Sequence, residues 1–342
     1  MFMYYFIIFI SSVFLAFLLT FVIKKISLKL GIVDIPNQER KIHKKAIPLL
    51  GGVAIFLCFF IVLYFVRDEL IAGNLEIKHW IGVFIGACFL MIGGFLDDKY
   101  NLSVKKQIIF PVLAILSIIA CGVNIEKISN PFGGFFYFNI LFSGIFIFLW
   151  LLGMMYTTKL LDGIDGLVSS ITCVGAFVIF IFTMTTKYYQ PDIGIASLIL
   201  TGACFGFLIL NWHPAKIFLG EGGSLFLGYI LGVLSIISGG KIAIALLIMG
   251  LPIMDVAWTI IRRIKLGKNP FKFADRKHLH FRLLDSGLTQ RQIVLVFCIF
   301  SLIFGTSALF LQSIGKILAL GFLILIMLLI IISFSYLDKK NE

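Results

Sequence analysis

Long apolar runs dominate the chain and alternate with short polar segments. About eleven runs approach the roughly 20 mostly apolar residues that a membrane-spanning helix needs. They lie near 2–23, 49–66, 80–96, 107–122, 139–158, 166–186, 193–211, 224–238, 242–261, 292–311 and 317–336. The runs are too continuous for strands of a membrane barrel, which alternate over about 10 residues. The pattern predicts an all-α, polytopic integral membrane protein of about 10–11 transmembrane helices, with residues 1–342 as a single domain.

Composition agrees with this class. The 342 residues are 60% hydrophobic and only 13% charged, whereas soluble domains are about 45–50% apolar. All six cysteines lie in apolar runs without a CxxC pair, which favours packing roles over disulfides or zinc ligation.

The charges are distributed unevenly between alternate polar segments. One set of segments holds 23 of the 29 lysines and arginines, which predicts an N-terminus outside and a C-terminus in the cytoplasm, within the inner (cytoplasmic) membrane. The first run lacks a basic n-region and a small-residue cleavage site, so we expect a retained helix. The same segments hold 12 of the 17 carboxylates. Because acidic residues contribute little to topology, this bias predicts a site at the cytoplasmic face.

Two aspartate pairs are the first candidates for chemistry. Asp97 and Asp98 are adjacent at the end of an apolar run, where two anions need a cation or share a proton. The alternative is a solvated helix end beside Lys99. Asp162 and Asp165 are three residues apart and share a face if they are helical, with glycines permitting close approach of a ligand. Here the alternative is that Asp165 caps the next helix.

Two further segments add a carboxylate and several bases. Glu221 lies in the glycine-rich "FLGEGGSLFLG", and a set of hard oxygen ligands at this surface would suit Mg²⁺ or Mn²⁺. His278, His280 and Arg282 lie in "DRKHLHFRLL". Two histidines spaced by two residues do not share a helical face, so only an extended or loop segment would aim both together. The alternative is a basic surface helix on anionic lipid.

Asp255 lies within the 242–261 run, and an ionisable residue there is a functional hypothesis by default. Pairing with Arg262 explains it equally well, so we leave it outside the site. The residues alone thus indicate a metal-dependent site that handles phosphates at the cytoplasmic surface, since phosphoryl chemistry needs a divalent ion, bases and a carboxylate.

Taken in order, "RKIHKKAIPLLGG", "GGFLDDKYNLSVKKQ", "KLLDGIDGL", "NWHPAKIFLGEGGSLFLG" and "DRKHLHFRLL" resemble the polyprenyl-phosphate N-acetylhexosamine-1-phosphate transferases. The resemblance implies that a polyprenyl phosphate, such as undecaprenyl phosphate, attacks the β-phosphorus of a UDP-N-acetyl sugar and releases UMP. GlcNAc-1-phosphate is the expected group, as a first membrane step of cell-wall or surface-polysaccharide synthesis. The expected partners are these two substrates and the bilayer, with no nucleic acid, and a homodimer is compatible with the sequence.

The motifs also imply a set of site residues. The catalytic positions would be Asp97, Asp98, Asp162 and Asp165, and the metal ligands Glu221 and Asp98. Substrate contacts would come from Arg40, Lys41, His43, Lys105, Lys159, Asn211, His278, His280 and Arg282.

The chain departs from the family pattern at several positions. Glu221 replaces the usual Asp, Lys159 and Tyr156 replace Asn, and Phe281 replaces a frequent third His. A carboxylate is kept at 221, and Lys159 could itself bind phosphate.

Four alternative functions stay open at this stage. One is transfer of a phospho-MurNAc-pentapeptide. A second is transport, although transporters place charges near the midplane. A third is CDP-alcohol phosphotransfer, whose Ala-Arg pair is missing from "DGIDGLVSS", and the fourth is an inactive scaffold.

Overall fold

The computed structural model describes residues 2–36, 42–43, 45–70, 76–130, 133–185, 189–237, 242–267 and 277–341. The chain is 79% helical. The helices are α1 (Phe2–Lys29), α2 (Gly51–Phe65), α3 (Arg67–Leu70), α4 (Ile77–Tyr100), α5 (Val104–Gln107), α6 (Ile109–Ala120), α7 (Ile140–Leu161), α8 (Leu167–Thr183), α9 (Pro191–Asn211), α10 (Gly220–Ile237), α11 (Ile242–Ile248), α12 (Gly250–Lys265), α13 (Leu279–Asp285), α14 (Gln290–Phe310) and α15 (Ser313–Asn341). Two antiparallel ribbons pair β1 (Val33–Asp34) with β2 (Ile47–Pro48) and β3 (Lys127–Ser129) with β4 (Phe135–Tyr137).

The predicted helical membrane class is confirmed. Within the described residues, seven helices are long and apolar enough to cross a membrane, and the number is eight if α11 and α12, bent by 76°, form one span. The other predicted runs form shorter helices, α2 with 15 residues, α6 with 12 and α8 with 17. Length and composition therefore establish fewer spans than the 10–11 that the sequence predicts.

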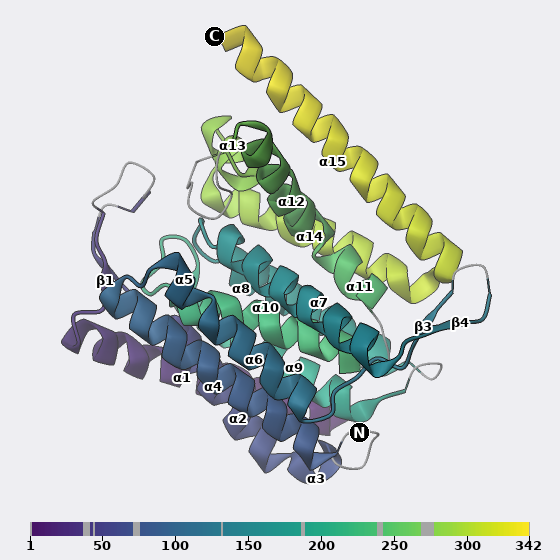
Figure 1. Ribbon diagram of the computed structural model, residues 1–342. Helices are drawn as coiled ribbons and strands as arrows, with labels where there is room; N and C mark the ends of the chain where they lie inside the picture. Colours follow the sequence, from purple (N-terminus) through teal and green to yellow (C-terminus); the bar gives the residue numbers. More distant parts are fainter. Residues whose placement is uncertain are drawn as a thin grey trace.

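The helices form a bundle whose centre is α9 and α10 (Figure 1). In the most apolar window of α10, 89% of residues are buried, against 11% for α15, which lies along one side of the bundle. The buried apolar residues make one continuous cluster from Ile8 to Met327. Long apolar side chains on α1 and α15 are exposed, as expected for helices that face lipid.

Glycines allow the central helices to approach closely. A Cβ atom added to Gly52 would lie 2.0 Å from the Cα of Gly223, and one added to Gly94 would lie 2.1 Å from the Cα of Gly222. Small residues at such contacts are the usual means of packing helices in a membrane, because little hydrophobic force drives helices together there. Both contacts fix the start of α10, where Glu221 lies.

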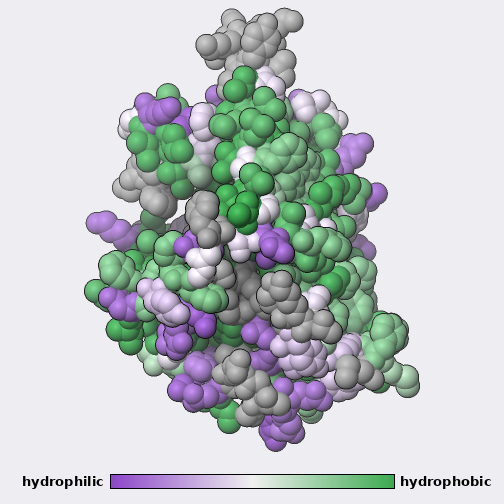
Figure 2. Space-filling view, turned by 90° about the vertical axis from the view of Figure 1, so that its right-hand side faces the viewer, coloured by the Kyte–Doolittle hydropathy of each residue, from purple (hydrophilic) through white to green (hydrophobic). Residues whose placement is uncertain are grey.

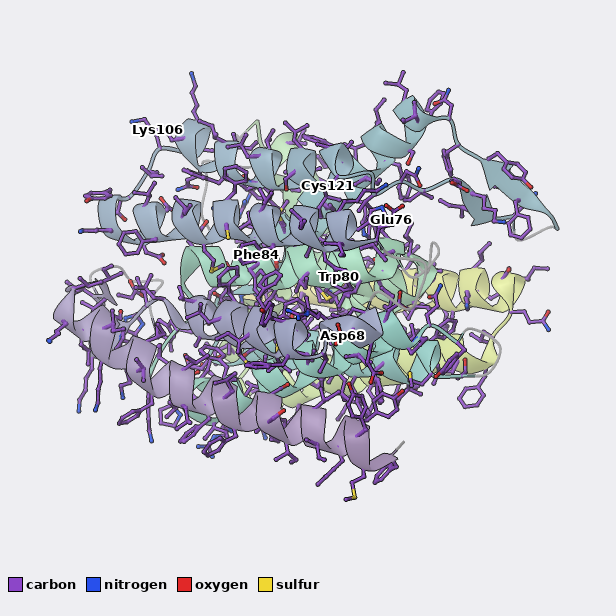
Figure 3. The ribbon with its side chains drawn as sticks, turned by 90° about the horizontal axis from the view of Figure 1, so that it is seen from below. Asp68, Glu76, Trp80, Phe84, Lys106 and Cys121 are labelled. Atoms are coloured by element: carbon purple, nitrogen blue, oxygen red, sulfur yellow. The ribbon has the colours of Figure 1, made fainter. Side chains whose placement is uncertain are left out.

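The two ends of the bundle differ. In Figure 3, Lys106 lies at one end, whereas Asp68 and Glu76 lie toward the other. Figure 2, which faces the right-hand side of Figure 1, shows hydrophobic residues over much of the upper and flanking surface and hydrophilic residues gathered toward the lower part. The chain termini also lie at opposite ends (Figure 1). The aspartate motifs lie at the end that carries Lys106.

Candidate active site

Asp98 joins the end of α4 to the start of α10. Both of its carboxylate oxygens accept a hydrogen bond from the backbone N–H of Glu221, at 3.1 and 3.2 Å. Gly220 has φ +74° and sits so close that an added Cβ would lie 2.5 Å from Asp98 Oδ2. The negative C-terminal end of α4 disfavours an anion, but the free N–H groups and positive dipole at the start of α10 stabilise it. The backbone N–H at the glycine-rich start of α10 thus binds a carboxylate of the same chain.

Asp97 is held by the turn that follows α4. Its Oδ1 accepts hydrogen bonds from the N–H of Leu102 at 2.7 Å and from Nε2 of Gln107 at 3.0 Å. The turn is closed by Asn101 in the left-handed conformation, with φ +49°. The ammonium of Lys99 lies over the rings of Phe95 and Tyr100.

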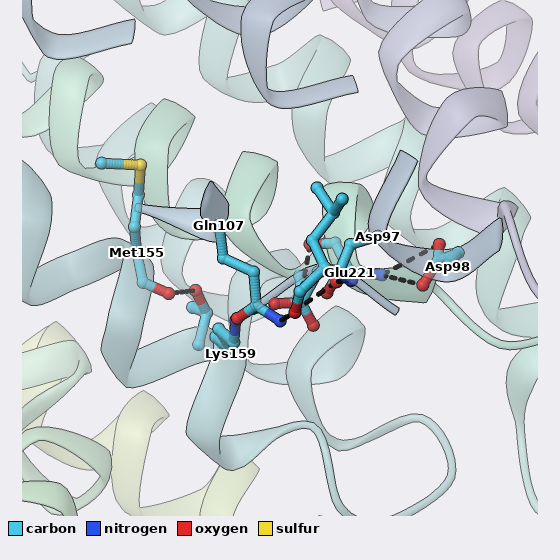
Figure 4. Close-up of polar contacts among 9 residues, drawn as sticks. Asp97, Asp98, Gln107, Met155, Lys159 and Glu221 are labelled. Atoms are coloured by element: carbon cyan, nitrogen blue, oxygen red, sulfur yellow. Dashed lines mark hydrogen bonds and ion pairs between the residues drawn. The ribbon is translucent and has the colours of Figure 1, made fainter. Parts of the chain in front are cut away.

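Lys159, in the last turn of α7, connects these groups (Figure 4). Its Nζ donates to Oε1 of Gln107 at 3.0 Å and forms an ion pair with Glu221. A continuous chain of polar contacts therefore runs from Asp97 through Gln107 and Lys159 to Glu221, whose N–H binds Asp98. Sequence reasoning did not single out Gln107; its one signal was a position beside two lysines at the start of an apolar run.

Asp162 and Asp165 do not share a helical face, because α7 ends at Leu161. Asp162 reaches solvent, yet the protein atoms around it, together with the negative charges of Glu221 and Asp165, raise its pKa to about 7. Glu221 contributes to this shift, so Asp162 belongs to the same acidic cluster.

Asp165 ties three segments together and does not cap α8, whose N-cap is Gly166 at φ +75°. Its Oδ2 lies 2.6 Å from Nδ1 of His213 and accepts the N–H of Ala215 at 3.0 Å. Its own N–H donates to Oε1 of Gln290 at 3.2 Å. The carboxylate of Asp165 thus joins the α7–α8 loop to the α9–α10 connection. Its backbone N–H joins the same loop to α14.

Asn211 is buried at the end of α9, and both ends of its amide have partners. Nδ2 donates to the carbonyl of Ile217 at 2.9 Å, and Oδ1 accepts from the hydroxyl of Ser169 at 2.8 Å. These contacts hold the connection before α10 against α8. The side chain of Asn211 thus stabilises the α9–α10 connection. Its contact with a substrate stays a prediction.

The histidine segment is anchored by Asp255. Its Oδ2 lies 2.9 Å from Nδ1 of His278, and its Oδ1 accepts the N–H of Leu279 at 2.8 Å. Asp255 lies outside the site that the sequence predicts, although a carboxylate in an apolar run is a signal of function. The structure instead makes it the fixed point for the first histidine.

His280 stacks on His278, with ring centroids 5.6 Å apart and planes 9° from parallel. The sequence indicates that a loop or extended segment is needed to aim both rings together, and in the structure only His278, the N-cap residue of α13, has extended backbone, whereas His280 lies in the first turn of that helix. A Cβ on Gly163 would lie 2.6 Å from Nε2 of His280, which places this ring beside the Asp162–Asp165 loop. Burial lowers the pKa of His280 to about 3 and keeps it neutral. Both histidines are buried, so the surface-helix alternative is wrong for them.

The remaining predicted contacts lie around this centre. Arg282 donates from Nε to the carbonyl of Lys277 and lies 5.7 Å from the ring centre of Phe334 on α15. It also lines a small open hollow between α12, α13 and α15. Nε2 of His43 lies 3.5 Å from Oδ2 of Asp34. Lys105 is exposed on α5. Arg40 and Lys41 lie outside the described residues.

The donor set fits a hard divalent cation. Among the described residues no three His, Cys, Asp or Glu side chains converge on one point as in a protein cage. Mg²⁺ does not require one, because it keeps several waters and binds one or two carboxylates together with substrate phosphates. Glu221 already attracts the ammonium of Lys159, which shows that this carboxylate binds a cation.

Comparison with known proteins adds a family assignment for much of this region. The profile described as glycosyl transferase family 4 matches residues 80–239. A probable undecaprenyl-phosphate N-acetylglucosaminyl 1-phosphate transferase of Bacillus subtilis is 34% identical over 311 residues, covering 89% of this chain and 84% of its own. The undecaprenyl-phosphate alpha-N-acetylglucosaminyl 1-phosphate transferase of Escherichia coli K12 is 30% identical over 304 residues, covering 80% and 75%. A decaprenyl-phosphate N-acetylglucosaminephosphotransferase of Mycobacterium tuberculosis is 28% identical over 304 residues, covering 80% and 74%.

Proposed function

Since the chain belongs to glycosyl transferase family 4, we propose that it transfers N-acetylglucosamine-1-phosphate from UDP-N-acetylglucosamine to a polyprenyl phosphate. An oxygen of the lipid phosphate bonds to the β-phosphorus of the nucleotide sugar. The bond from that phosphorus to the bridging oxygen breaks, and UMP leaves with this oxygen. The lipid then carries the sugar through a diphosphate. The polyprenyl acceptor and the sugar are taken from the names of the relatives.

The observation that supports this proposal best is the polar network at the meeting point of α4, α7 and α10. Asp97, Gln107, Lys159, Glu221 and Asp98 are connected through consecutive contacts (Figure 4). Phosphoryl transfer needs little covalent help from a protein. It needs positioned groups and charge compensation around the transferred phosphorus, and rigid helix ends supply both.

The contacts suggest different tasks for the paired aspartates. Both oxygens of Asp98 contact the same N–H of Glu221, so we assign Asp98 to positioning the start of α10. Each of these oxygens keeps a second lone pair, which can also bind a cation. Within the described part of the chain, Asp97 accepts hydrogen bonds only at Oδ1, so Oδ2 can meet the lipid phosphate and take its proton. Asp162, with a pKa of about 7, can exchange a proton near neutral pH.

Glu221 and Asp98 would hold Mg²⁺ or Mn²⁺ at this site. The bound ion would supply neutralisation of the charge on the diphosphate. The neutral, buried His280 borders the Asp162–Asp165 loop. The contact of His278 with Asp255 fixes the position of the histidine segment. We assign this histidine segment to closing the side of the site that receives the nucleotide sugar.

We place the site on the cytoplasmic face of the inner membrane, with the N-terminus outside. The support is the sequence count of 23 of 29 lysines and arginines on this side. Soluble UDP-sugars reach such a site from the cytoplasm, and the lipid phosphate reaches it along the membrane surface.

The test is UMP release by purified full-length protein with undecaprenyl phosphate, Mg²⁺ and a panel of UDP-N-acetyl sugars. We expect lipid-dependent UMP release that is fastest with UDP-N-acetylglucosamine. Asp97→Asn should reduce the rate at least about 100-fold, as loss of a general base does. If no sugar in the panel gives lipid-dependent UMP, the proposed function is wrong.

A further inference from the structure

Lys159 lies between two carboxylate-bearing segments, and three of the positions that depart from the family pattern meet there. Its ammonium forms an ion pair with Glu221 and lies 5.6 Å from the centre of the Tyr156 ring. The side chains of Lys159 and Glu221 are only 18% and 21% exposed. Residues that contact one another at a site shielded from solvent are energetically coupled, so a change at one of them alters the effect of a change at the other.

The length of the Glu221 side chain matters for this contact. Asp98 fixes the backbone of Glu221 through its N–H. From that fixed backbone, the additional methylene of glutamate carries the carboxylate toward α7. An aspartate at 221 would hold its oxygens about one bond length further from Lys159.

Lys159 and a metal ion compete for the same carboxylate. Resting on the function proposed above, Glu221 is a ligand of the divalent cation, yet its Oε1 carries the ammonium of Lys159 in this structure. Two cations at one carboxylate repel each other strongly in a partly desolvated site. The ammonium of Lys159 has a second acceptor, because Nζ also donates a hydrogen bond to Oε1 of Gln107 at 3.0 Å.

We propose that Lys159 is the resident counter-ion of Glu221, and that it must leave this carboxylate before a divalent cation can bind. In this role Lys159 is a positioning residue that weakens metal binding in the absence of substrate. The ammonium then remains beside the site on Gln107, where it can meet a substrate phosphate.

The test measures Mn²⁺ binding to the purified full-length chain by electron paramagnetic resonance, with no substrate present. Lys159→Met removes the charge, and we expect the Kd for Mn²⁺ to fall by on the order of tenfold. Lys159→Gln is a second neutral variant, in case the first does not fold. Lys159→Arg keeps the charge, so its Kd should stay within about threefold of the wild-type value.

Lys216→Met is the matched control. It removes one positive charge from an exposed lysine in the α9–α10 connection and should leave the Kd unchanged. A double-mutant cycle adds a second requirement. In a Glu221→Asp background the shorter side chain loses the Lys159 contact, so Lys159→Met should then change the Kd by less than about threefold. Equal effects in both backgrounds, or no tightening in either neutral variant, would overturn the proposal.

Glu221→Gln separates this proposal from the proposed function. If Mn²⁺ does not bind saturably, or binds equally well to Glu221→Gln, the metal assignment itself fails. If Glu221→Gln abolishes binding but the neutral Lys159 variants bind no tighter than wild type, only the counter-ion role fails.

Discussion

The contact between Gly94 and Gly222 offers the sharpest test of how the fold positions the site. In Gly94→Ala, the new Cβ would lie 2.1 Å from Cα of Gly222, whereas an ordinary contact begins at 3.4 Å. The backbones of α4 and α10 must therefore separate by about 1.3 Å. The hydrogen bonds that the N–H of Glu221 donates to the two oxygens of Asp98, now 3.1 and 3.2 Å, would open beyond about 4 Å and be lost.

The expected effects follow from this displacement. Overpacking of this kind costs about 1–3 kcal/mol of stability. A displacement of about 1 Å at reacting groups can cost about 100-fold in rate. We therefore expect kcat for UMP release to fall by roughly two orders of magnitude, while the protein remains folded in detergent by size-exclusion chromatography and thermal unfolding.

Gly153→Ala is the matched control, because Gly153 also lies in a long helix, α7, but nothing is within 4 Å of an added Cβ. This variant should keep its activity within about threefold and gain slightly in stability, as glycine-to-alanine changes in helices do. If Gly94→Ala matches Gly153→Ala in kcat, the close approach of α4 and α10 does not position the site.

Three further outcomes are expected. Asp165→Ala should lower the free energy of unfolding by about 1–3 kcal/mol, measured by thermal unfolding, because His213 and the N–H of Ala215 lose their acceptor; an unchanged stability would contradict the joining role. His280 resists protonation until about pH 3 when folded, whereas an unfolded histidine titrates near pH 6.5. Its contribution to stability is thus complete above about pH 6.5 and is lost as the pH falls from there toward 3, by at most about 1.4 kcal/mol per pH unit, and His280→Phe should flatten this slope. Removal of divalent ions with EDTA should abolish UMP release, and added Mg²⁺ should restore it, whereas full activity in EDTA would exclude the metal assignment.

The helical architecture follows directly from the sequence, because long apolar runs leave few alternatives in a membrane. The motifs also identified most residues that the fold brings together. Asp98 and Glu221 are separated by 123 positions in the chain, yet local composition indicates both of them together with Asp97, and the family resemblance adds Lys159. Charged residues next to apolar runs are few, which makes such selection effective.

What the sequence does not reveal is which polar groups pair. Gln107 links Asp97 to Lys159 across 52 residues, and a single glutamine carries no sign of such a partner. For Asp255 the sequence leaves both a functional role and pairing with Arg262 open, whereas the structure shows that its oxygens hold a segment 23 residues later. Asp165 fits the local pattern of a helix cap, and only the three-dimensional arrangement gives it His213 instead. Tertiary partners of this kind depend on packing, which local patterns do not encode.

The most direct measurement of the central claim follows the β-phosphate of the donor. UDP-N-acetylglucosamine labelled with ³²P at the β-phosphorus is incubated with the purified protein, Mg²⁺ and undecaprenyl phosphate, and the products are divided between butanol and water. Transfer of a sugar phosphate predicts that the label enters the lipid phase as fast as UMP accumulates in the water. Label that stays in water as UDP, while the sugar moves to the lipid, would show transfer of the sugar alone and contradict the account.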